Sequence, residues 1–79
     1  MSKFVSVGFG SYVDADKAVA VLNPDSAPIR RKIQEAKENG NLVDSTYGRK
    51  VRTVIVMESG QLVTCAISTD TLAERLNKD

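Results

Sequence analysis

The chain has 79 residues, a net charge of +1 and four aromatic residues, a size that predicts one small domain spanning residues 1–79. It has a single cysteine, Cys65, and no histidine, which excludes an intrachain disulfide and a zinc site of the usual Cys/His kind. Without a histidine to activate it, Cys65 is predicted to be a small core residue in a reducing compartment.

The N-terminal part of the sequence predicts short strands. Residues 4–7, 12–13 and 18–22 have the apolar, β-branched character of strands. Gly8-Phe9-Gly10 supplies the conformational freedom of a turn between the first two. This part is therefore predicted to contribute two or three strands to a sheet.

A helix is predicted next. Asp25 or Ser26 can cap its start, Pro28 suits its first turn, and Gly40 suits the position just after its end. Its apolar side chains recur at helical spacing and form one narrow stripe: Ile29, Ile33 and Ala36. A narrow stripe indicates a helix that covers one side of a sheet and leaves its other faces in solvent.

The C-terminal half predicts three strands and a second helix. Residues 42–47 have the pattern of a short strand, and Gly48 suits a tight bend after it. Residues 51–67 predict a β-hairpin with Ser59-Gly60 as a two-residue turn. A last short helix is expected, capped by Ser68 or Thr69, with Leu72 and Leu76 as its apolar pair. The fold class that follows is α+β: a small, mainly antiparallel sheet, one central helix and one short C-terminal helix.

The run Val54-Ile55-Val56 predicts a strand that is apolar on both faces. Two short helices and four aromatics offer little material to cover such a sheet, so a monomer would leave apolar surface or a sheet edge exposed. We therefore predict a homo-oligomer, which would also stabilise so short a chain. The alternative is that the two helices and the N-terminal strands suffice.

Several functional classes find no support in the sequence. The stretch "GFGS" is too short for a dinucleotide-binding loop, and no full G-x-G-x-x-G or Walker motif is present. No segment is apolar enough for a signal peptide or a membrane span, so a cytoplasmic protein without membrane association is expected. We expect a non-enzymatic protein with no cofactor and no bound metal.

Charge is distributed unevenly along the chain. From Arg30 to Arg52 there are seven cations and three anions, whereas the remainder has four cations and seven anions. One basic cluster lies at the predicted helix start, and the other lies in "YGRKVR", just before an apolar strand. Arginine and lysine on a protruding turn suit contacts with phosphate, but both clusters are also compatible with ordinary solvated surfaces, and Arg31 or Lys32 could pair with Glu35. Spacing alone leaves these alternatives open.

The runs "VGFGSYV", "SAPIRRKIQEAKENGNLVDSTYGRKVRTVIVMESG" and "TLAERL" resemble the RemA family, the bacterial extracellular-matrix regulatory proteins. The resemblance covers almost the whole chain. It implies a cytoplasmic, DNA-binding activator of biofilm extracellular-matrix operons, in which ring-shaped homo-oligomers contact double-stranded DNA through repeated basic patches and bend or wrap it. The DNA-linked basic pair of the family falls on Arg49 and Lys50, and an earlier basic position falls on Lys17. Lysine stands at positions 17 and 50, where the family commonly has arginine; lysine keeps the charge but lacks the bidentate fork.

The candidate DNA-binding residues are Arg49, Lys50, Lys17, Arg30, Arg31 and Arg52. Pro28 also matches a position of functional consequence in the family and is expected to shape the helix start. One alternative is a structural scaffold whose cations lie at subunit interfaces, paired with carboxylates such as Asp14, Asp16 or Glu58. Another is a module for RNA or a small ligand, which the shortage of aromatics disfavours.

Overall fold

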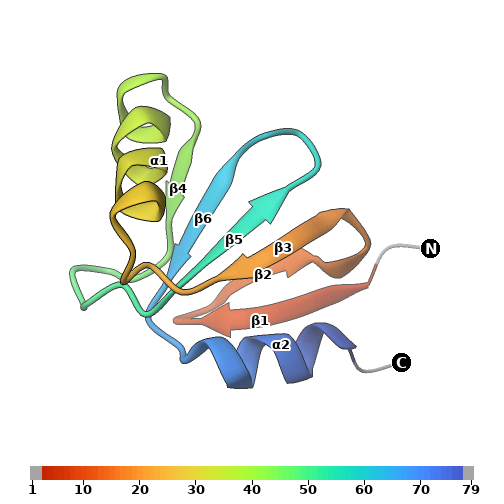
Figure 1. Ribbon diagram of the computed structural model, residues 1–79. Helices are drawn as coiled ribbons and strands as arrows, with labels where there is room; N and C mark the ends of the chain where they lie inside the picture. Colours follow the sequence, from red (N-terminus) through yellow and green to blue (C-terminus); the bar gives the residue numbers. More distant parts are fainter. Residues whose placement is uncertain (1–2, 78–79) are drawn as a thin grey trace.

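The computed structural model describes residues 3–77 and has the α+β fold predicted from the sequence (Figure 1). Two helices and six strands are present in this part of the chain, together with one short 3-10 turn, η1. In chain order they are β1 (Phe4–Gly8), β2 (Ser11–Asp14), η1 (Ala15–Lys17), β3 (Ala18–Leu22), α1 (Ala27–Glu38), β4 (Leu42–Asp44), β5 (Thr53–Met57), β6 (Leu62–Cys65) and α2 (Thr69–Asn77). Neither described helix is long and apolar enough to cross a membrane.

The strands form two sheets, one of two strands and one of four. β1 and β2 form an antiparallel hairpin of their own, and the larger sheet has the order β3-β5-β6-β4. Its pairs are antiparallel except for β4, which runs parallel to β6. Because β4 and β5 flank β6, the segment between them must cross the end of β6, and this segment is residues 45–52.

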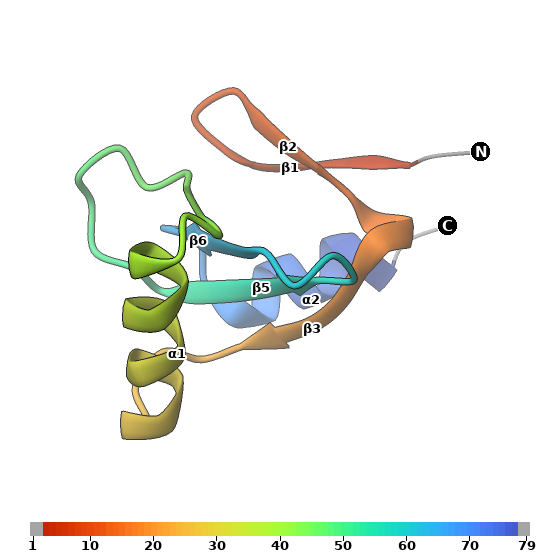
Figure 2. The ribbon, with the colours of Figure 1, turned by 90° about the horizontal axis from the view of Figure 1, so that it is seen from above.

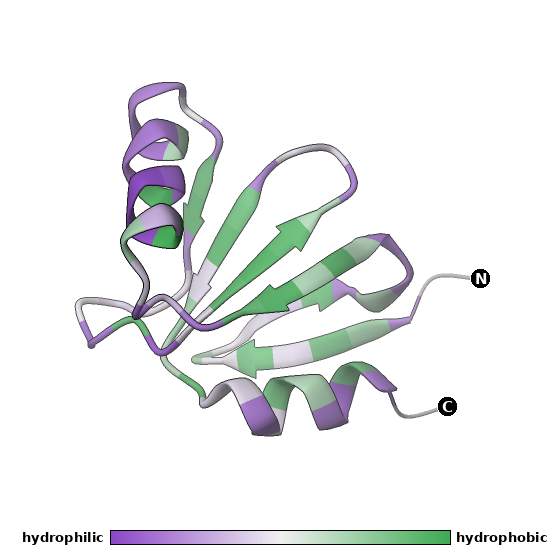
Figure 3. Ribbon diagram, viewed as in Figure 1, coloured by the Kyte–Doolittle hydropathy of each residue, from purple (hydrophilic) through white to green (hydrophobic). Residues whose placement is uncertain are grey.

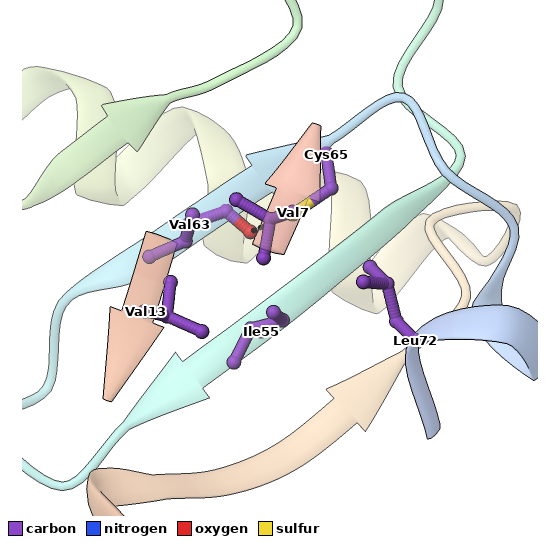
Figure 4. Packing of buried hydrophobic residues seen from close by; sticks show 6 residues of the cluster. All are labelled: Val7, Val13, Ile55, Val63, Cys65 and Leu72. Atoms are coloured by element: carbon purple, nitrogen blue, oxygen red, sulfur yellow. Dashed lines mark hydrogen bonds between the residues drawn. The ribbon is translucent and has the colours of Figure 1, made fainter. Parts of the chain in front are cut away.

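β5 is buried on both faces, as the run Val54-Ile55-Val56 predicted. Ile55 packs on one face in a cluster with the β1–β2 hairpin and α2 (Figure 4), and Val54 packs on the other with α1. Figure 2 shows the hairpin lying over the larger sheet. The first cluster consists of Val7, Val13, Ile55, Val63, Cys65 and Leu72, and the second of Ala36, Val54 and Leu62. Cys65 is fully buried, in agreement with its predicted role as a core residue.

The helix ends follow from local side-chain chemistry. Ser26, one of the two predicted caps, accepts a hydrogen bond from the Ile29 N–H at 3.4 Å and so satisfies an otherwise free amide at the start of α1. Ser68 does the same for α2 by accepting from the Thr71 N–H at 3.4 Å. The outward side of α1 is strongly polar (Figure 3), which matches its narrow apolar stripe.

Two local predictions were wrong. The β5–β6 turn has three residues, Glu58 to Gly60, because the Met57 N–H donates to the Gln61 carbonyl at 2.9 Å and closes the hairpin there. Gly60 takes the left-handed conformation that such a loop requires, with φ +93°. The predicted strand 42–47 ends at Asp44, because the Thr46 N–H turns to the Asp44 side chain.

All four aromatic residues are exposed. Phe4, Tyr12 and Tyr47 are 63–67% exposed and Phe9 is 45% exposed, so the buried core contains only aliphatic side chains and Cys65. Tyr47 is therefore a surface residue. Val19, on the free edge strand β3, is also 66% exposed. The two helices and the N-terminal hairpin thus cover both faces of β5, as the alternative expected, while apolar side chains on the hairpin and on the β3 edge stay exposed.

Candidate nucleic-acid interface

The segment of residues 45–52, here called the basic loop, joins β4 to β5 and carries Arg49, Lys50 and Arg52. All three side chains are exposed. Within residues 3–77, the only lysine or arginine side chain that donates a hydrogen bond to another residue is Arg75, which reaches the Ser6 carbonyl at 3.0 Å. The three cations of the basic loop therefore keep their charge and donors available.

The start of the basic loop is fixed by one carboxylate oxygen. Asp44 Oδ1 accepts from the Thr46 hydroxyl at 2.6 Å, the Thr46 N–H at 2.9 Å and the Thr64 hydroxyl at 3.0 Å. The hydrogen bond from the Thr46 hydroxyl is the largest cause of a lowered pKa for Asp44. Ser45 adds a second tie to β6, since its hydroxyl donates to the Thr64 carbonyl at 2.6 Å.

A tight turn then projects Arg49 from the loop. The Arg49 N–H donates to the Thr46 carbonyl at 3.1 Å across Tyr47 and Gly48, whose φ angles are +54° and +86°. Positive φ at both central positions is the pattern of a type I′ turn, which favours glycine. The predicted bend at Gly48 is confirmed, and Tyr47 adopts a conformation unusual for a bulky side chain.

The turn of the β1–β2 hairpin meets the basic loop at two aromatic rings. Phe9 and Tyr47 stack with their centroids 5.6 Å apart and their planes 24° from parallel. The Arg49 Cζ atom lies 4.4 Å from the centroid of the Phe9 ring, a cation–π geometry. Arg49 is thus held by a neutral group from a distant part of the chain.

Lys50 and Arg52 line a different surface. They border a groove of about 320 Å³ together with the segment before α1 and the start of α2. Two carboxylates, Asp25 and Asp70, border the same groove. The Arg52 backbone is fixed there, because its N–H donates to the Cys65 carbonyl at 2.8 Å and its carbonyl accepts from the Thr69 hydroxyl at 3.3 Å. Arg49 is not among the residues that line this groove.

Lys17 is not brought to the basic loop. Its carbonyl accepts from the Glu58 N–H at 2.8 Å, and it lines a hollow beside the β5–β6 turn. The basic loop enters β5 at Thr53, the opposite end of the strand, roughly 13 Å away at strand spacing.

Arg30 and Arg31 are exposed on the first turns of α1. The segment before this helix, Asn23 to Asp25, shares the groove with Lys50 and Arg52. The start of α1 therefore approaches the basic loop, and neither arginine side chain donates a hydrogen bond within residues 3–77.

Sequence reasoning missed two residues that shape this surface, Asp44 and Phe9. The order Asp-Ser-Thr carries a usable signal for the first, because an aspartate often accepts from the backbone two residues further on. Phe9 stands between two glycines, which indicates a turn but not its partner.

Comparison with known proteins places this surface in a family context. A model of the RemA-like family, described as extracellular matrix regulatory protein A-like, matches residues 4–76. A relative from Lachnoclostridium phytofermentans is 45% identical over 99% of this chain and 86% of its own length. Relatives from Acetivibrio thermocellus and Bacillus cytotoxicus are 49% and 48% identical over 95% of this chain, and over 81% and 86% of their own lengths. All three are provisionally named regulatory proteins.

Proposed function

The chain belongs to the RemA-like family, whose members are regulatory proteins, and from this premise we propose that it is a non-enzymatic, DNA-binding transcriptional regulator that acts as a ring-shaped homo-oligomer. The regulated genes would be those of an extracellular matrix, in keeping with the description of the family.

The observation that carries the proposal is that the basic loop is fixed in place while its three cations are exposed. Arg49, Lys50 and Arg52 are exposed, and their side chains make no hydrogen bond within residues 3–77. The loop that bears them is tied to the sheet at both ends, by Asp44 and by the Arg52 backbone. Exposed cations with free donors on a fixed loop suit the phosphate backbone, whose contacts position a protein on a duplex without reading its sequence.

Oligomerisation explains how a chain of net charge +1 could bind DNA tightly. Each subunit offers only a few phosphate contacts, and a ring would repeat them along one duplex, making binding multivalent. The exposed apolar side chains of the β1–β2 hairpin and the free edge strand β3 support such assembly. Repetition around a ring would also give Lys17 and Arg49, which are apart within one subunit, a common DNA path, and it would favour a bent or wrapped duplex.

A specific observation keeps a second candidate in view, a structural scaffold whose cations hold subunits together. Asp25 and Asp70 border the groove of Lys50 and Arg52, so these charges could serve contacts between proteins. Arg52, with its fixed backbone, is the cation most suited to that role.

The test is the double variant Arg49→Ala with Lys50→Ala. DNA affinity is measured by fluorescence anisotropy over a range of salt concentrations, and assembly mass by light scattering. The proposal expects binding to be lost, or its salt slope to fall by roughly 0.9 per phosphate contact removed, with the mass unchanged. Lys37→Ala, which removes one cation from the end of α1, is the control for the loss of charge elsewhere and should bind like the parent chain. A double variant that binds normally would refute the proposal, and one that falls apart into smaller species would favour the scaffold.

A further inference from the structure

The contact between Phe9 and Arg49 has a property that an ordinary ion pair lacks. A carboxylate partner would neutralise the guanidinium and occupy its N–H donors. The Phe9 ring, 4.4 Å from the Arg49 Cζ atom, is neutral and accepts no in-plane hydrogen bond. Arg49 is thereby oriented while its full charge and all five N–H donors remain available for an anion.

The aromatic pair adopts an unfavourable backbone conformation to make this contact. Phe9 and Tyr47 have φ angles of +52° and +54°, and they are the two non-glycine residues with positive φ within the described part of the chain. Bulky side chains rarely adopt this region, whereas glycine and asparagine adopt it readily. Strained residues of this kind cluster at functional sites.

Neither ring serves the hydrophobic core. Phe9 is 45% exposed and Tyr47 is 67% exposed, and neither belongs to the two buried clusters. The Phe9 ring stacks on Tyr47 and carries the Arg49 guanidinium on its face. The chain thus keeps an unfavourable backbone conformation at two turns, although the contact formed there contributes little to the hydrophobic core.

We propose that Phe9, supported by Tyr47, is a positioning residue that orients the Arg49 guanidinium toward a DNA phosphate, so that the β1–β2 turn is part of the DNA-binding site. This inference rests on the proposed function. It adds a second segment of the chain, distant in sequence and free of cations, to an interface otherwise defined by basic residues alone.

Three substitutions at position 9 separate positioning from charge. Phe9→Leu removes the ring and keeps an apolar side chain. DNA affinity should fall by about two- to fivefold for each Arg49–phosphate contact, the loss expected for one exposed cation–π pair. The salt slope should stay unchanged, because no cation is lost. Phe9→Tyr retains the ring and should restore affinity.

Phe9→Asn supplies a signature that a merely structural role would not give. Asparagine suits a positive φ, so the melting temperature should stay constant or rise by a few degrees. DNA binding should nevertheless weaken as in Phe9→Leu. Lys37→Ala, on α1, is the control here too and should bind like the parent chain.

The variants are compared by anisotropy on one duplex, by salt titration and by light scattering. If Phe9→Leu binds like the parent while Arg49→Ala binds weakly, the positioning role is refuted and the proposed function stands. If Arg49→Ala also binds like the parent, the proposed function fails and the positioning role fails with it. A change in assembly mass for Phe9→Leu would assign Phe9 to assembly and overturn the inference.

Discussion

Asp44 and Thr46 form a closed local unit in which one carboxylate oxygen accepts both the hydroxyl and the amide hydrogen of the threonine, at 2.6 and 2.9 Å. The unit ends β4 and sets the direction in which the chain leaves the sheet. Because the turn bearing Arg49 closes on the Thr46 carbonyl, the position of the cation depends on this carboxylate.

Asp44→Ala should therefore both destabilise the protein and weaken its binding to DNA. It removes the acceptor of three hydrogen bonds and leaves the Thr64 hydroxyl, on a buried residue, without that partner. The expected loss of unfolding free energy is about 1–2 kcal/mol, at the lower end for charged hydrogen bonds because the Asp44 side chain is exposed. Urea unfolding at fixed protein concentration measures it.

Asp44→Asn is the matched control for this change. Asparagine keeps an oxygen acceptor at the same place and loses only the charge, so its loss of stability should be smaller than that of Asp44→Ala. Equal stability of the alanine variant and the parent chain would show that the unit does not hold the loop.

Acid pH should weaken the same unit. The pKa of Asp44 is lowered in the folded state from its ordinary value of 3.8, chiefly by the hydrogen bond from the Thr46 hydroxyl. A lowered folded pKa means that the stabilising contribution is fully present above the unfolded value and is lost as pH falls through the folded value. Unfolding free energy should thus show no contribution of Asp44 to its pH dependence near neutrality and a decline below about pH 4.

The decline should be shallower in Asp44→Asn, which has no carboxylate to protonate at this position. Parallel urea titrations of the two proteins between neutral and acid pH make the comparison. Identical curves would mean that Asp44 has the same pKa in the folded and unfolded states.

Lys50→Arg should strengthen DNA binding. The resemblance to the RemA family implies arginine at this position, and a guanidinium can grip a phosphate with two parallel hydrogen bonds where an ammonium acts as a point charge. The charge is unchanged, so affinity should rise by a few fold with the same salt slope. Lys37→Arg, on α1, is the control and should leave affinity unchanged. An unaltered affinity for Lys50→Arg would argue that Lys50 faces solvent or a protein neighbour and makes no phosphate contact.

The outer face of the β1–β2 hairpin offers a test of assembly. Phe4 and Tyr12 lie there, 65% and 63% exposed, on the side opposite the buried pair Val5 and Val13. Replacing both aromatics with lysine should lower the assembly mass measured by light scattering, because two charges would have to be desolvated between subunits. DNA binding should weaken although every native cation remains, since multivalency is lost.

The control for that test adds the same two charges elsewhere, as Gln34→Lys with Asn39→Lys on exposed positions of α1 and its C-cap. Its mass should match the parent. If the hairpin variant also keeps its mass, the aromatics of this face do not join subunits.

The sequence predicted most reliably what local chemistry decides. Ser26, Pro28 and Gly40 bound α1 because capping, the fixed φ of proline and the freedom of glycine act within a few residues. The double burial of β5 followed from three consecutive apolar residues. The β5–β6 turn was predicted one residue too short, because Ser59-Gly60 fits more than one loop length and only the pairing of Met57 with Gln61 decides between them.

The arrangement of the candidate site was less accessible. Spacing left the roles of the three loop cations open, and it did not predict that Arg49 lies on the Phe9 ring while the other two border a groove. It could not predict that Tyr47 would be exposed on a stack with Phe9, because that contact depends on how the hairpin lies over the sheet. Nor could it tell that Lys17 lies at the other end of β5, since strand direction is a property of the whole topology.

Phe9 and Arg49 come from opposite halves of the chain, and their contact exists only because the hairpin is docked on the folded sheet. The entropy of the arginine side chain is therefore lost during folding, which burial of the aliphatic core drives. It does not reduce the free energy of binding a ligand. A synthetic peptide with the sequence of the basic loop would carry the same three cations without this preorganisation. Its affinity for a duplex should be lower than that of the same loop in the folded protein, although the charge is the same. An electrostatic potential map of such a chain is therefore an incomplete guide to where nucleic acid binds.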